Sequence, residues 1–118
     1  MSSKIKNDLG TITVSGEVIA RIAGFAAISC YGIVGMAARD VRDGLVHLLK
    51  KESLTKGVKI TRIADDTISM DFHIIVEYGT NIPAICEVLL SNVRYSVEEY
   101  IGIKADKINI FVEGVRID

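Results

Sequence analysis

The chain has 118 residues, of which 49% are hydrophobic and 25% charged, with a mean hydropathy of +0.35. These values exclude a disordered chain and suit a single domain over residues 1–118, with an ordered core at about 9–115. The net charge of -1, from 14 basic and 15 acidic side chains, makes a surface built to neutralise nucleic-acid phosphates unlikely in energetic terms.

The first predicted elements are a short strand and a helix. Alternating polar and apolar residues predict a strand over 9–15, and Ser15 is a suitable N-cap for a buried helix that ends near Cys30. Two sets of residues on this helix are expected to pack: a large apolar stripe of Val18, Ile22 and Phe25, and a small-residue surface of Ala20, Ala23, Gly24 and Ala27. A second helical segment is predicted from Gly35 toward Lys51.

Two strand-like runs from Val58 to Tyr78 predict a β-hairpin, because Ala64-Asp65-Asp66 between them suits a tight turn. The second run alternates strictly, so one face of the sheet is predicted to be covered and the other open. The residues expected on the covered face are Ile68, Met70, Phe72, Ile74, Val76 and Tyr78.

Asn81 as N-cap and Pro83 in the first turn predict a further helix, which Gly102 ends in a left-handed conformation. Its apolar residues recur every fourth position, as Ile85, Leu89, Val93 and Val97. A last strand follows over 107–114, with Ile108, Ile110 and Val112 inward. The predicted fold class is α+β, a two-layer sandwich of order β-α-(α)-β-β-α-β. It has a mainly antiparallel sheet of about four strands and helices on one face.

Catalytic, metal and cofactor sites are all predicted to be absent. His47 and His73 have no partners at ligand spacing, no serine lies in a nucleophile-elbow pattern, and no phosphate-binding glycine motif occurs. Cys30 and Cys86 are far apart among apolar neighbours, which predicts two reduced, inert thiols.

Gly32-Ile-Val-Gly35 raises the alternative of a KH-like RNA-binding module, in which such a loop between two helices clamps a nucleic-acid backbone. The apolar middle residues disfavour phosphate contact, because cationic or polar residues would be needed there. A simple structural corner between two helices is the competing interpretation.

Three apolar residues interrupt the predicted open face, one from each of three strands: Ile63, Ile75 and Phe111, with His73 beside them. If the strands are neighbours, these side chains form an apolar patch that suits a protein partner or a second copy. A few exposed apolar groups are also normal on any sheet, and free edge strands offer another route to association.

No secretion signal follows the N-terminus, so a cytoplasmic location is expected. The uncharged stretch Ile22–Ala38 is long enough for a tilted bilayer helix, but its glycines and polar residues predict a broken segment instead.

Four blocks resemble the bacterial alkaline-shock protein family, also called the envelope stress response family of Gram-positive bacteria. They are Cys30-Tyr-Gly-Ile-Val-Gly-Met-Ala37, Lys56-Gly-Val-Lys59, Ile74-Ile-Val-Glu-Tyr-Gly-Thr-Asn-Ile-Pro83 and Val112-Glu-Gly-Val115. The chain is most similar to the short housekeeping branch. The resemblance implies a protein without enzymatic activity, linked to the cell envelope, that self-associates or is held at the membrane by a membrane-protein partner. It carries over only signature positions, expected to be structural: Gly32, Gly35, Tyr78, Gly79, Asn81 and Pro83.

Overall fold

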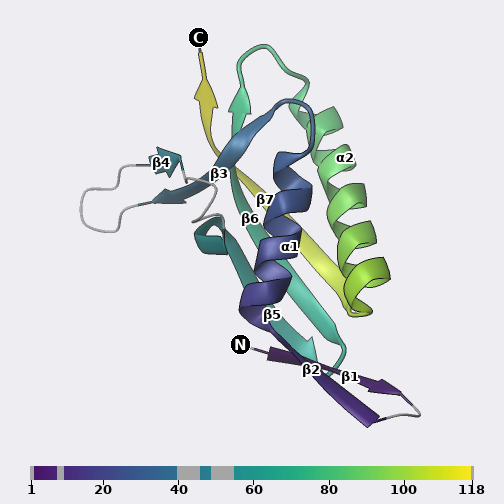
Figure 1. Cartoon of the computed structure of the whole chain (residues 1–118). Coiled ribbons are helices and arrows are strands. Elements are labelled where there is room, and N and C mark those ends of the chain that lie inside the picture. The colour runs from purple at the N-terminus through teal and green to yellow at the C-terminus, as the bar shows by residue number, and fades with distance from the viewer. Residues whose placement is uncertain (1, 8–9, 40–45, 49–54, 118) are drawn as a thin grey trace.

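The computed structural model describes residues 2–7, 10–39, 46–48 and 55–117. Two helices, α1 and α2, lie side by side on one face of a five-stranded sheet (Figure 1). The two-layer α+β class is therefore confirmed. The elements are β1 (Ser2–Asn7), β2 (Gly10–Ser15), α1 (Gly16–Ile28), β3 (Ile33–Arg39), β4 (Val46–Leu48), β5 (Val58–Ala64), β6 (Thr67–Glu77), α2 (Ile82–Tyr95), the π-helical η2 (Ser96–Ile101) and β7 (Lys104–Arg116).

Strand β6 is the centre of the sheet. One side of β6 pairs antiparallel with β5 along its first half and with β3 along its second half, and β4 continues the sheet beyond β3. The other side pairs with β7 along the whole length of β6, in the parallel direction. The sheet is thus mainly antiparallel, as predicted, and the β5–β6 hairpin is confirmed.

Helix α1 begins where the sequence predicts, since the Ser15 hydroxyl accepts a hydrogen bond from the Val18 N–H at 3.2 Å. The expected packing of its large apolar stripe is wrong, because Val18 and Phe25 are exposed. The face that packs carries Ile19 and the small residues Ala20, Ala23, Gly24 and Ala27. Small side chains let the helix lie close to the sheet and to α2, and this close approach rotates the larger residues outward.

The predicted second helix is also wrong where the structure describes it. Residues Ile33–Arg39 form β3, which pairs with both β6 and β4. An uncharged run of small and β-branched residues has no clear period, so its conformation follows from the strands that lie beside it. The remainder of the prediction, at 40–45 and 49–51, lies outside the described residues.

Helix α2 follows its sequence signals closely. The Asn81 side chain accepts a hydrogen bond from the Ala84 N–H at 3.2 Å, and Pro83 lies in the first turn. The chain continues into η2 and stops at Gly102, whose φ of 83° lies in the left-handed region. The predicted buried face is confirmed, with Ile85, Leu89, Val93 and Val97 all buried.

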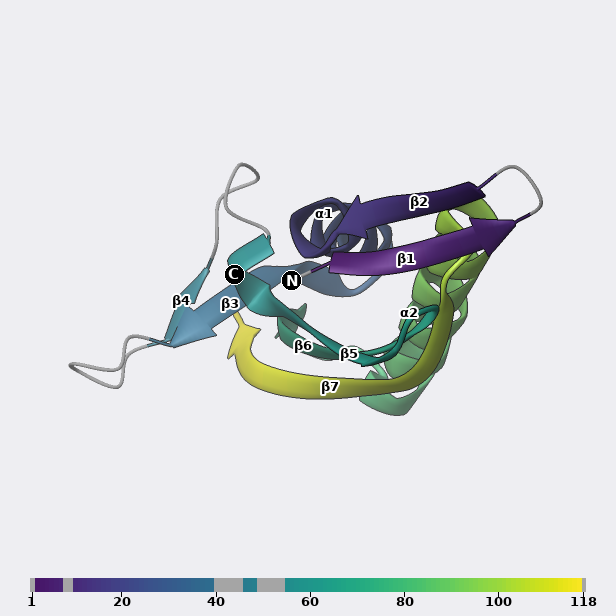
Figure 2. The same ribbon diagram turned by 90° about the horizontal axis from the view of Figure 1, so that it is seen from below.

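The N-terminal strand has a partner that the sequence pattern did not indicate. β1 and β2 form an antiparallel hairpin, with Ser2 opposite Ser15 and Asn7 opposite Gly10. This hairpin leads into α1 and forms a separate two-stranded sheet at one end of the molecule (Figures 1 and 2).

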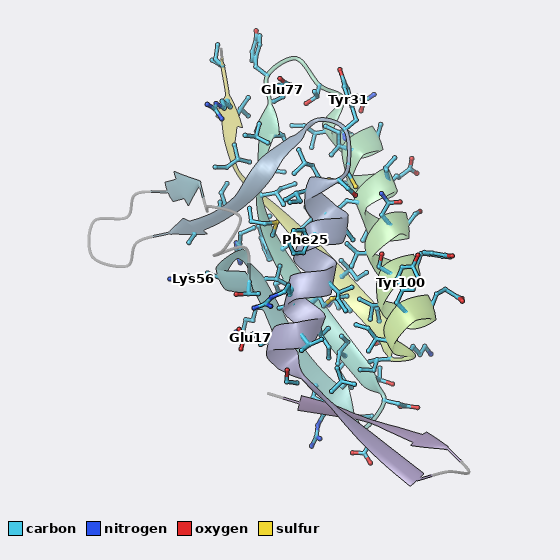
Figure 3. All side chains as sticks on the ribbon, viewed as in Figure 1. Glu17, Phe25, Tyr31, Lys56, Glu77 and Tyr100 are labelled. Carbon is cyan, nitrogen blue, oxygen red and sulfur yellow. The ribbon has the colours of Figure 1, made fainter. Side chains whose placement is uncertain are left out.

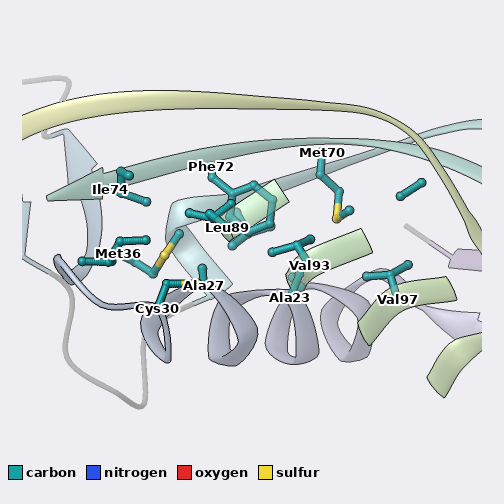
Figure 4. Close-up of a cluster of buried hydrophobic side chains, with 14 of the residues drawn as sticks. Ala23, Ala27, Cys30, Met36, Met70, Phe72, Ile74, Leu89, Val93 and Val97 are labelled. Carbon is teal, nitrogen blue, oxygen red and sulfur yellow. The ribbon is translucent and has the colours of Figure 1, made fainter. Parts of the chain in front are cut away.

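The core lies between the helices and the inner face of β6 (Figure 4). Met70, Phe72 and Ile74 of β6 pack there with residues of both helices and of β3. The predicted covered face is confirmed for five alternate residues, Ile68, Met70, Phe72, Ile74 and Val76. Tyr78 does not belong to it, because β6 ends at Glu77 and the Tyr78 side chain is 69% exposed.

Candidate protein-interaction surface

The open face is the side of β6 and β7 that points away from α1 and α2. In Figure 2, β7 and β6 lie on the side of the molecule opposite to α1 and the β1–β2 hairpin. No described element covers this side of the two strands. Strand pairing places the residues of the two strands next to one another on it, as Ser69 with Lys107, Asp71 with Asn109 and His73 with Phe111.

A small group of contacts, the His73–Phe111 cluster, occupies the middle of the open face. The rings of His73 and Phe111 stack, with centroids 5.0 Å apart and an angle of 14° between planes. His73 Nδ1 lies 3.6 Å from Glu113 Oε2. One step along the strands, Asn109 Nδ2 donates a hydrogen bond of 2.8 Å to Asp71 Oδ1. These contacts hold the Phe111 ring in place although 45% of Phe111 is exposed.

The structure brings together only part of the predicted patch. Ile75 is half-buried next to Gly114, two residues along β6 from His73. Ile63 is 56% exposed but lies at the far end of β5, beside the Ala64–Thr67 pair. The six residues of β6 from Thr67 to His73 separate Ile63 from Phe111 by about 20 Å. The predicted three-residue patch is therefore a two-residue patch with a distant third residue.

Sequence alternation did not indicate the role of Glu113. The pairing of β6 with β7 shifts by one residue at Asp106 and again at Glu113, so these two are extra residues in β7. Beyond each shift a period of two places residues on the wrong face. Val112, predicted to point inward, is accordingly 37% exposed, whereas Ile108 and Ile110 pack against the core as expected.

A family model for alkaline shock protein 23, described as having a cell envelope-related function, matches residues 4–117. The chain belongs to this family. The resemblance found in the sequence is thereby confirmed.

Similar proteins of this family occur in Gram-positive bacteria. The uncharacterized protein YloU of Bacillus subtilis is 43% identical over 118 residues, which are 99% of this chain and 98% of YloU. The uncharacterized protein YqhY of the same organism is 32% identical over 93% of this chain and 80% of YqhY. A stress response regulator gls24 homolog of Streptococcus pyogenes is 23% identical over 91% of this chain and 59% of that relative. None of these three names is that of an enzyme, and no solved structure gives a significant match.

The family signature at Gly32 and Gly35 has a different setting from the predicted one. Gly32, with φ of 88°, turns the chain from α1 into β3, and Gly35 lies within β3. A Cβ on Gly32 would come within 2.5 Å of Ile85 Cδ1, so the turn lies directly against α2. The KH-like hypothesis requires this loop to join two helices, and a helix followed by a strand does not provide that geometry.

The second part of the family signature is the turn from β6 to α2. Gly79 has φ of 83°, and the Tyr78 N–H bonds to the Arg116 carbonyl at 2.9 Å. Asn81 caps α2 as described above, and Pro83 needs no N–H at its position. Tyr31, in the α1–β3 turn, is also exposed, and Figure 3 shows it pointing outward near the start of α2.

The residues that the structure describes contain no group of three or more His, Cys, Asp or Glu side chains that could hold a metal ion. His47 lies in β4, opposite Ala38, and His73 lies on the open face. The hollows on the surface are shallow; one of them lies along α2 and is lined by Glu87, Val88, Leu90, Ser91 and Arg94.

Both cysteines are free thiols. Cys30 is buried, and its Sγ accepts a hydrogen bond of 3.1 Å from Asn92 Nδ2. Cys86 is half-buried on α2, and burial raises the pKa of its thiol.

Of the helices in the described ranges, none has the length and apolar character needed to cross a membrane. The uncharged stretch Ile22–Ala38 is divided between α1 and β3, as the broken-segment prediction required.

Proposed function

We propose that this protein is a non-enzymatic interaction protein of the cell envelope-related family, and that it works by binding other protein surfaces through its open face. The binding partner is a second copy or another protein. The His73–Phe111 cluster carries this proposal, because it holds an aromatic side chain half-exposed on a sheet face that no described element covers. Aromatic residues fixed in this way are typical anchors of protein interfaces.

The proposal includes a cytoplasmic location and no catalytic step, metal or cofactor. Attachment to the membrane, where it occurs, is then indirect and passes through a membrane-protein partner. The similarity to stress response regulator gls24 homologs supports a role in envelope stress. The cell envelope-related function of the family supports it as well.

The test compares wild type with Phe111→Asp and Ile75→Asp in two measurements. Size-exclusion chromatography with light scattering over a range of concentrations reports self-association. Pull-down with mass spectrometry reports partners. We expect both variants to lose association at least about tenfold, since a buried charge at an interface anchor is strongly unfavourable.

Ile63→Asp is the matched control, because Ile63 is an exposed isoleucine of the same sheet about 20 Å from Phe111. It should associate as the wild type does. Denaturation in urea checks that all three variants fold. A wild-type chain that stays monomeric at high concentration and captures no partner would refute the proposal, and so would equal binding by Phe111→Asp and wild type.

A further inference from the structure

The outer edge of β7 is the longest strand edge without a partner among the described residues. β6 uses one of its sides for β3 and β5 and the other for β7, so β7 ends the sheet. β7 spans 13 residues and pairs with β6 alone. Its outer side therefore presents a row of backbone N–H and C=O groups to any strand that can align with it.

The middle of this edge is regular and partly apolar. Between the two register shifts, Lys107–Val112 pairs with Ser69–Ile74 without interruption. The side of β7 facing the helices carries Ile108 and Ile110, which are only half-buried, and Val112, which is exposed. A strand added at this edge would cover the apolar area that the chain's own helices leave accessible.

We propose that a second copy of this chain adds to the outer edge of β7 in the antiparallel direction, about a two-fold axis that passes through Ile110. Residues directly opposite each other across an antiparallel pair lie on the same face of the combined sheet. On the helix side, Ile110 then faces the partner's Ile110, and Ile108 faces the partner's Val112. On the open face, Phe111 faces the partner's Asn109.

Charge complementarity selects this register. The axis through Ile110 places Lys107 opposite the partner's Glu113, and the symmetry creates this ion pair twice. Both side chains belong to the open face, since Lys107 pairs with Ser69 and Glu113 contacts His73. An axis through Asn109 would place Lys107 opposite Phe111, and an axis through Phe111 would place it opposite Val115. Neither of these registers forms an ion pair at Lys107.

The same register limits the length of the pairing. Lys104 would face the partner's Arg116, and like charges opposite each other are unfavourable. We therefore infer that the paired segment ends near the two register shifts and spans Lys107–Glu113. Such an interface is well below the roughly 1,200 Å² of a standard stable complex, so association should depend on concentration.

This pairing rests on the proposed function, because it assigns the second copy as an occupant of the surface that ends at β7. The test uses charge exchange in the full chain. Lys107→Glu alone and Glu113→Lys alone should each weaken self-association about tenfold, because each places like charges opposite each other twice. The double variant Lys107→Glu/Glu113→Lys should restore association to near wild type, and so should mixing the two single variants.

This rescue separates intermolecular contact from damage to the fold. Within one chain, Lys107 and Glu113 are six residues apart, about 20 Å along the strand, so they cannot pair with each other. Lys59→Glu, an exposed charge reversal in β5 on the other side of β6, is the matched control and should leave association unchanged.

A second measurement places the axis directly. In a chain with Cys30→Ala and Cys86→Ala, Ile110→Cys should cross-link to itself with a short thiol reagent, whereas Ile63→Cys should not. Failure of the rescue together with absent cross-linking at Ile110 would overturn the β7 pairing. If Phe111→Asp still abolished association in that case, the proposed function would stand and another occupant or register would be required. A strictly monomeric wild-type chain would also overturn the pairing, while Phe111-dependent capture of another protein would still support the proposed function.

Discussion

The two faces of β6 carry different kinds of residue and face different surroundings. On the covered face, five alternate residues from Ile68 to Val76 are at most 1% exposed and form the centre of the core. On the open face, the residues between them are half-exposed and make polar or stacked contacts with β7. The comparison teaches that one strand both stabilises the fold and presents a surface, and that the two roles alternate residue by residue.

The largest expected difference between the two faces is in the free energy of unfolding. Phe72→Ala should lower it by about 3–5 kcal/mol, because it leaves a cavity beneath both helices. Phe111→Ala should lower it by less than about 1 kcal/mol, since the ring is half-exposed and leaves no enclosed space. Urea denaturation measures both. Equal losses would mean that Phe111 belongs to the core and would break the comparison.

An intermediate effect is expected at the two signature glycines with positive φ. Gly32→Ala should destabilise the protein by about 2–4 kcal/mol, because the new Cβ is strained and also meets Ile85 of α2. Gly79→Ala has a similar φ but no atom within 4 Å of the new Cβ, so the loss should be about 1 kcal/mol. Thermal unfolding of the two variants gives the order. A larger loss at Gly79 than at Gly32 would contradict the packing of the α1–β3 turn against α2.

The smallest expected effect concerns the cysteine thiols of the covered layer. Alkylation with iodoacetamide needs the thiolate, and burial raises the pKa of Cys86, so its reaction should reach half its maximal rate at a higher pH than a free cysteine does. Folding thus favours the protonated thiol, and stability should fall slightly as pH rises through this range. Mass spectrometry of the labelled peptides follows both thiols. Buried Cys30 should react more slowly than Cys86, and the reverse order would contradict the burial described here.

The candidate surface could be predicted only in part. Alternation along β6 placed His73 and Ile75 on the open face, and the same period in the last strand placed Phe111 there. Glu113 could not be found in this way, because an extra residue in β7 changes the face of the residues after it. The separation of Ile63 from Phe111 depends on where β5 and β7 meet β6, and no local pattern in the sequence contains that information.

The sequence by itself determined the features that depend on neighbouring residues. These are the Ser15 and Asn81 caps, the β5–β6 hairpin, the buried face of α2 and the left-handed stop at Gly102. Each results from hydrogen bonds, dihedral preferences or a hydrophobic period within a few residues.

Only the tertiary structure decided that Ile33–Arg39 is a strand, that α1 packs through its small residues, and that β7 runs parallel to β6. The physical reason is the same in all three cases. A strand takes half of its hydrogen bonds from a distant segment, and a helix packs the face that lets it approach its neighbours most closely. These choices become fixed only when segments far apart in the sequence meet.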